Sequence, residues 1–99
     1  MLTGKQRSYL KTLATELDAT VYIGKDDLTE NILTEMSRYL DAHELLKVKI
    51  QEGSLLEPKE TANECAERLN AEFVQAIGRK FVLYKAAANK EDRKIVLPR

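Results

Sequence analysis

The chain has 99 residues, which is the length of one domain and leaves no room for a second independent core. Hydrophobic residues make up 43% and charged residues 32%, a composition typical of a folded globular protein and not of a disordered or collagen-like chain. No apolar run approaches the ~18 residues of a membrane span, and the amino-terminal segment lacks the apolar stretch of a signal peptide. We therefore expect a single cytoplasmic domain over residues 1–99 that does not associate with a membrane.

The residues that commonly carry catalysis are few. There is one cysteine, Cys65, and one histidine, His43, so an intramolecular disulfide and a multi-cysteine metal site are both excluded. Cys65 falls in the predicted core stripe of a helix and His43 at a helix end, which favours structural roles for both. Neither GxGxxG nor GxxxxGK[ST] can be written in the sequence. We expect no enzymatic activity, no cofactor, no metal site and no small-molecule substrate.

The charges cancel in total but are segregated along the chain. Sixteen basic and sixteen acidic residues give a formal net charge of zero. Residues 1–25, 47–51 and 73–99 are net positive, whereas residues 26–46 and 52–72 are net negative. If the acidic segments form helices that face one way, the opposite face of a neutral protein is positive.

The first expected element is a helix over residues 3–17. Thr3 and Gln6 form a capping-box pattern, and apolar residues follow at helical spacing. Residues 20–23 then form a short β-rich run that Gly24 ends.

A second helix follows a tight loop. Asp27 is the expected N-cap, with Glu30 three residues later, ahead of apolar residues between positions 32 and 40. Residues 46–50 alternate apolar and polar side chains, which predicts a strand that is buried on one side and solvated on the other.

The remainder predicts a third helix and a hairpin. Pro58 suits the first turn of a helix that presents a narrow stripe of small residues. The runs 73–77 and 81–85 are joined at Gly78, which can supply the positive φ of a type II′ turn. We expect residues 86–94 to be polar and mobile and residues 95–97 to add a short edge strand, because Pro98 cannot donate to a central ladder.

The predicted order is therefore α-β-α-β-α-β-β. Strand–helix–strand crossovers that end in a hairpin favour an α/β fold, a two-layer sandwich with a mixed four-stranded sheet. In this arrangement one face of the sheet is open to solvent.

Two places in this fold are candidates for binding an anion. The first is the loop at Gly24 and Lys25, because a glycine turn that opens into a helix directs backbone N–H groups toward a phosphate. Lys5 and Lys11 of the first helix could assist it, although a separation of six residues places them only loosely on one face.

The second candidate is the open face of the sheet. Lys47 and Lys49 alternate onto the same side of their strand, and Tyr22 projects opposite to its aliphatic neighbours, so an aromatic ring is expected near two lysines. Arg79 and Lys80 at the hairpin extend either patch.

Several segments, taken together, resemble the YhbY-type family of single-domain CRM (chloroplast RNA splicing and ribosome maturation) proteins. The resemblance covers nearly the whole chain in order and spacing. It is carried by residues 2–7, 23–25, 28–30, 44–50, 74–85 and 95–99.

The resemblance implies an RNA-binding domain whose fold is similar to the C-terminal domain of bacterial translation initiation factor three. It also implies association with precursors of the large ribosomal subunit. The characteristic family loop is GxxG, analogous to the KH loop that clamps a nucleic-acid backbone. Here the positions read Gly24-Lys25-Asp26-Asp27, so an acidic residue replaces the second glycine, and Asp27 is expected to cap the following helix instead.

We therefore predict an RNA-binding protein that docks on structured ribosomal RNA, with selectivity that comes from RNA shape. The alternative is a protein-interaction adaptor that binds a basic ribosomal protein or assembly factor through its acidic helices.

Overall fold

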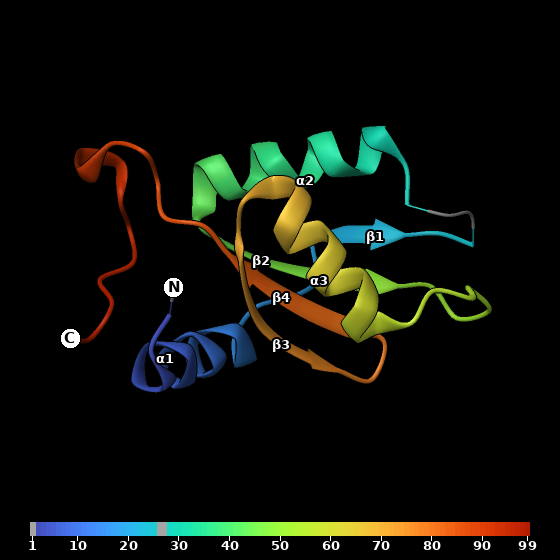
Figure 1. Cartoon of the computed structure of the whole chain (residues 1–99), viewed down its shortest axis with the longest axis horizontal. Helices are drawn as coiled ribbons and strands as arrows, with labels where there is room; N and C mark the ends of the chain where they lie inside the picture. The colour runs from blue at the N-terminus through green and yellow to red at the C-terminus, as the bar shows by residue number, and fades with distance from the viewer. Residues whose placement is uncertain (1, 26–27) are drawn as a thin grey trace.

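The computed structural model describes residues 2–25 and 28–99, which form three α-helices, four strands and one short 3-10 helix in the predicted order (Figure 1). None of these helices is long and apolar enough to cross a membrane. The elements in chain order are α1 (Gly4–Thr15), β1 (Val21–Ile23), α2 (Glu30–His43), β2 (Leu45–Ile50), α3 (Pro58–Leu69), β3 (Glu72–Ile77), β4 (Lys80–Tyr84) and the 3-10 helix η1 (Lys90–Asp92).

The four strands form one mixed sheet in the order β1-β2-β4-β3. β1 and β2, which α2 connects along the chain, pair directly and are parallel. β4 is antiparallel to both β2 and β3. The α/β class, the mixed sheet and the terminal hairpin are thus confirmed. β1 and β3 are the two edges of the sheet.

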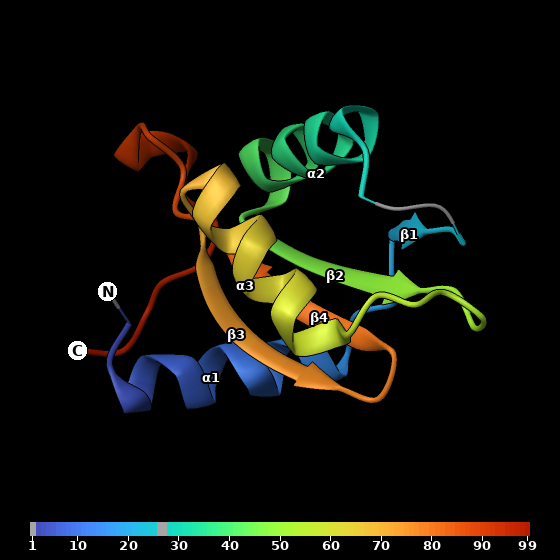
Figure 2. The same ribbon diagram turned by 45° about the vertical axis from the view of Figure 1, so that its right-hand side comes forward.

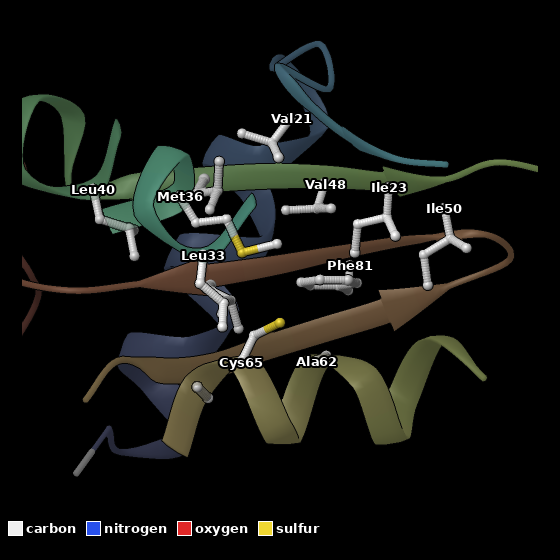
Figure 3. Close-up of a cluster of buried hydrophobic side chains, with 13 residues drawn as sticks. Val21, Ile23, Leu33, Met36, Leu40, Val48, Ile50, Ala62, Cys65 and Phe81 are labelled. Carbon is white, nitrogen blue, oxygen red and sulfur yellow. The ribbon is translucent and has the colours of Figure 1, made fainter. Parts of the chain in front are cut away.

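The larger core lies between one face of the sheet and helices α2 and α3. Phe81 of β4 is fully buried at its centre, beside apolar side chains from β1 and β2 (Figure 3). Cys65 and Ala62 point from α3 toward the sheet, which confirms the predicted small-residue stripe and the core position of the cysteine. Small side chains let α3 approach the strands closely, so Phe81 fits beneath it.

Helix α1 packs against the other face of the sheet. Leu10 and Ala14 of this helix are fully buried against Leu45, Val82 and other residues of a second apolar cluster. Figure 2 shows α1 across the sheet from α2 and α3. The sandwich of helices on a mixed sheet is confirmed, but the face that was expected to be open is covered in part by α1. A stripe of leucines along a helix indicates that one side of the helix is buried, but it does not indicate which face of the sheet the helix packs against.

The helix ends follow their local signals with one exception. Thr3 and Gln6 form the capping box, and Pro58 occupies the first turn of α3, as predicted. The N-cap of α2 is Thr29, whose hydroxyl accepts the Ile32 N–H at 3.2 Å. The predicted cap, Asp27, lies outside the described residues, and its assignment as N-cap is wrong.

The hairpin between β3 and β4 has the predicted turn. Ile77 and Lys80 are paired, so Gly78 and Arg79 form the loop. Gly78 has a φ of 59°, whereas Arg79 is not among the residues with positive φ. A positive φ at the first loop position alone is the signature of a type II′ turn.

The carboxyl-terminal segment differs most from its prediction. The carboxylate of Glu44, which is 1% exposed, accepts the backbone N–H groups of Ala87, Lys94 and Ile95 at 2.8, 2.6 and 2.9 Å. Residues 95–97 therefore form no edge strand, and both ends of the segment expected to be mobile are bound to the body of the protein. Ile95 and Leu97 pack against the α1 cluster.

Candidate nucleic-acid interface

A row of four side chains crosses all four strands at one level of the sheet. Strand pairing places Tyr22 opposite Lys49, Lys49 opposite Lys80, and Lys80 opposite Ile77. Directly paired residues share a face, and their neighbours Val48 and Phe81 face α2 and α3. The row therefore lies on the α1 side.

Helix α1 covers only the other end of that face and leaves this row in solvent. Tyr22 is 62% exposed and Ile77 is 68% exposed, and both lysines are exposed. Tyr22 therefore lies beside Lys49 on an uncovered part of the sheet, as predicted, but the second lysine of the row is Lys80 and not Lys47.

Lys49 and Lys80 face each other without a carboxylate between them. In the described part of the chain the ion pairs within 4.0 Å are those of Arg68 with Glu30 and Glu64, at 2.6 and 3.4 Å. Like charges directly across a sheet are destabilising. The two ammonium groups therefore create a positive potential that an anion would relieve.

Lys47 has a different role from the one expected. Its ammonium donates to the carbonyl oxygens of Ala14 and Leu17, at 3.2 and 3.1 Å, at the carboxyl end of α1. The Ala14 carbonyl also accepts the Leu17 N–H at 3.1 Å, so the ammonium adds a second hydrogen bond there, and its charge compensates the negative end of the helix dipole. The side chain is half-buried and thus joins α1 to β2.

Arg79 is likewise engaged inside the protein. Its Nη2 donates to the carbonyl oxygens of Gln51 and Ser54, each at 3.2 Å. Its Nε is buried and has no hydrogen-bond partner among the described residues. Arg79 therefore fixes the loop between β2 and α3 instead of projecting from the tip of the hairpin.

The loop at Gly24 and Lys25 lies beside the loop that Arg79 holds. A Cβ built on Gly24 would lie 3.5 Å from Oε1 of Gln51, and one built on Gly53 would lie 3.5 Å from Cε of Lys25. In Figures 1 and 2 the loop over residues 51–55 projects from the same end of the sheet as the end of β1. Gly24 and Lys25 thus border the sheet row.

Helix α2 does not begin directly at the glycine. Its first helical residue is Glu30, and the hydroxyl of the N-cap Thr29 already accepts one of its terminal N–H groups. The expectation that Gly24 opens straight into a helix is wrong, so the anion site predicted at this loop keeps Lys25 but loses the helix N-terminus.

The basic surface continues from the row along the edge strand β3. A depression of about 220 Å³ is lined by Lys47, Lys80 and residues of β3 that include Gln75 and Ile77. A neighbouring depression of about 510 Å³ also includes Gln75 and Ile77, and Arg7, Lys11 and Lys59 line it. We call the surface carrying Arg7, Lys11, Lys49, Lys59 and Lys80 the basic face.

Two of these residues were missed by the sequence analysis. Arg7 donates from its Nε to the carbonyl oxygen of Phe73 at 3.3 Å, which brings its guanidinium to the edge of β3. Lys59 lies in an acidic segment, and only the packing of α3 beside β3 brings it to Lys11. Nothing in the local sequence marks Lys59. Lys5, by contrast, is exposed on α1 and does not line either depression.

Cys65 and His43 lie where the sequence predicts them, in the core and at the end of a helix. His43 is the last residue of α2 and stacks on Tyr39, with ring centroids 4.3 Å apart. Burial, with the nearby Glu64 adding to it and Arg68 opposing it, raises the pKa of the Cys65 thiol to about 12. A thiol in this state is a weak nucleophile.

Comparison with known proteins identifies the family. The model of the CRS1/YhbY (CRM) domain matches residues 2–85. The chain belongs to the CRM domain family. The resemblance noted from the sequence is thereby confirmed.

Individual relatives in this CRM family cover almost the whole chain. The Haemophilus influenzae "RNA-binding protein" is 40% identical over 99% of this chain and 96% of its own length. The Bacillus subtilis "Probable RNA-binding protein YqeI" is 33% identical over 99% of this chain and 100% of its own length. The solution structure of a hypothetical protein from Staphylococcus aureus superposes with a TM-score of 0.80 at 35% identity, covering 99% of this chain and 100% of that one.

Proposed function

We propose that this chain acts over residues 1–99 as one RNA-binding domain, which docks on structured RNA through its basic face without catalysing a reaction. The observation that carries the proposal is the separation of charge. The cations of the basic face have no carboxylate partner within the described residues, whereas both described ion pairs lie on the opposite side, on α2 and α3. The names of the curated CRM relatives support the choice of RNA as the anion.

The chemistry of the face fits a phosphate backbone. Five cations spread over α1, β2, β4 and α3 match phosphates at several points of a folded RNA better than they match one small anion. Positions that contact phosphate carry no sequence information, so selectivity comes from RNA shape. Gly24, Lys25 and Lys5 are proposed as flanking contacts, and Lys47 and Arg79 as residues that hold the surface in place.

A salt titration tests this proposal. If about five phosphates are engaged, the logarithm of affinity for a labelled ribosomal RNA fragment falls against the logarithm of salt concentration with a slope near −3.5 to −4.5. A response that does not depend on salt rejects electrostatic docking. Charge reversal at Lys11 is the matched probe, and reversal at Lys90, which is exposed on η1, is its control.

We further propose that the RNA is that of large ribosomal subunit precursors in the cytoplasm. The resemblance to the YhbY-type CRM proteins supports this finer assignment. Crosslinking in cells, followed by sequencing of the attached RNA, tests it, with large-subunit precursor RNA as the expected product. Enrichment of messenger or transfer RNA instead would retain RNA binding and reject the ribosomal assignment.

The second candidate is an adaptor that binds a basic protein. It is favoured by the exposed carboxylates that α3 presents away from the sheet, at Glu60, Glu64 and Glu67, together with Glu57 at its N-cap. Charge reversal at these four positions discriminates the two functions. An RNA binder retains or gains affinity for RNA, whereas an adaptor loses its protein partner.

A further inference from the structure

The depression beside Tyr22 has a composition that phosphate binding alone does not explain. It has a volume of about 560 Å³ and is lined by Tyr22, Ile23, Gly24, Lys49, Gln51 and Glu52. One lysine and one glutamate give it no net charge, although it adjoins the basic face. Its size falls within the usual range of sites for small organic groups.

The aromatic ring in this depression is exposed but fixed. Tyr22 is 62% exposed, and its hydroxyl donates to the carbonyl oxygen of Ala19 at 2.9 Å. The ring is therefore tethered at both ends, through its Cα in β1 and through its hydroxyl. A flat ring with little freedom left to lose is a suitable stacking platform for a nucleobase.

The charged groups around the ring are arranged in an order that suits a nucleotide. Lys49 lies directly opposite Tyr22, with Lys80 beyond it, so a phosphate is attracted to that side. Gln51 and Glu52 follow at the end of β2 and line the same depression. A carboxylate repels phosphate but accepts hydrogen bonds from the N–H groups at the edge of a base.

From this arrangement, and resting on the proposed function, we propose that Tyr22, Lys49 and Glu52 form a site for one unpaired nucleotide of the bound RNA. The base stacks on Tyr22 with its edge toward Glu52, and its phosphate lies at Lys49 and Lys80. Bases within a continuous duplex are not available for such stacking. The RNA recognised therefore carries a bulged or looped nucleotide where it crosses β1.

Two synthetic RNA hairpins test the proposal, one fully paired and one identical except for a single bulged nucleotide replaced by a fluorescent adenine analogue. The bulged hairpin is expected to bind about 5-fold to 100-fold more tightly than the paired one, the range that one stacked base supplies. Stacking on Tyr22 should quench the fluorescence of the analogue.

Variants separate stacking from charge. Tyr22→Leu should abolish the preference and the quenching while leaving affinity for the paired hairpin unchanged. Tyr22→Phe should retain most of the preference, and Lys49→Gln should weaken both hairpins. Tyr9→Leu, a change at another exposed tyrosine, on α1, is the matched control and should change nothing. Unchanged melting temperatures show that each variant is folded.

The outcomes distinguish this site from the proposed function. Equal affinity of the wild-type protein for the two hairpins overturns the nucleotide site but leaves electrostatic docking intact. A preference that survives in Tyr22→Leu also overturns it. If neither hairpin binds, or if both bind with an affinity that does not depend on salt, the proposed function is overturned and this site with it.

Discussion

The carboxylate of Glu44 accepts the backbone N–H of Lys94 at 2.6 Å, across fifty positions of sequence. Glu44 is the C-cap of α2, with a φ of 68°, and it joins the helix to β2. The same side chain accepts the N–H groups of Ala87 and Ile95. One buried carboxylate thus connects the end of a helix to the carboxyl-terminal segment.

Replacement of the Glu44 carboxylate should destabilise the protein, because three backbone N–H groups depend on it as their acceptor. Glu44→Ala leaves three N–H groups without their acceptor, and we expect a loss of about 2–3 kcal/mol in the free energy of unfolding. Urea unfolding measures this loss, with Glu91→Ala on the exposed 3-10 helix as control. Hydrogen exchange at Lys94 and Ile95 should accelerate in the same variant. Unchanged stability and unchanged exchange would contradict this role.

The stability of the protein should also depend on pH through Glu44. Burial alone would raise the pKa of this carboxyl, but the hydrogen bonds from Ala87, Ile95 and Lys94, with the charge of Arg93, hold it below the ordinary value of 4.5. A lowered pKa in the folded state contributes stability that is fully present above the unfolded pKa. That contribution is lost as the pH falls from about 4.5 through the lower folded pKa.

Comparison with Glu44→Gln isolates the effect. The difference in the free energy of unfolding between wild type and Glu44→Gln should be constant near neutral pH and should shrink in acid. A difference that grows as the pH falls would mean that the pKa of Glu44 is raised, contrary to its contacts.

Lys47 and Lys49 should respond in opposite ways to the same change. Lys47→Gln removes a cation from the carbonyls of α1 and should cost about 1 kcal/mol of stability. Lys49→Gln relieves the repulsion with Lys80 and should leave stability unchanged or raise it by a few tenths of a kcal/mol, roughly the size of one cross-strand pair. Thermal unfolding of the two single variants provides the measurement.

For RNA binding we expect the reverse: replacement of Lys49 should have an effect, and replacement of Lys47 should have none. Lys49→Gln removes one phosphate contact, so the slope of log affinity against log salt should become shallower by about 0.7 to 0.9. Lys47→Gln should leave that slope unchanged wherever the variant is folded. Equal changes of slope in the two variants would show that Lys47 also reaches the RNA.

Cys65 should be inert in the folded protein. With a pKa of about 12, roughly one thiol in ten thousand is ionised at pH 8, and the side chain is fully buried. Iodoacetamide at pH 8 should therefore modify the native protein far more slowly than the same protein in concentrated urea. Similar rates in the two conditions would mean that α3 opens readily from the sheet.

The elements could be predicted from the sequence because each carries its own local signal. Thr3 with Gln6 determines where α1 begins, Pro58 marks the first turn of α3, and Gly78 supplies the turn of the hairpin. These signals depend on residues a few positions apart. Alternation in β2 likewise indicated which side chains face the core.

Features set by distant contacts could not be predicted in this way. Alternation places Lys47 away from the core, but only the position of α1 decides that its ammonium meets carbonyl oxygens. Residues 95–97 have the composition of a strand, yet the N–H of Ile95 is bound to Glu44. The prediction that Tyr22 lies beside Lys49 is correct because their proximity depends only on the register between β1 and β2.

The two ends of the described chain are held together on the side away from the loops. Gln6 donates from its Nε2 to the carbonyl oxygen of Pro98 at 3.1 Å, and Leu2 and Leu97 belong to the same apolar cluster. Figures 1 and 2 show both ends at one extremity and the loop over residues 51–55 at the other. A fusion partner or surface tether attached at either end would therefore present Tyr22 and Gly24 outward, which makes the protein suited to immobilised capture of its ligand.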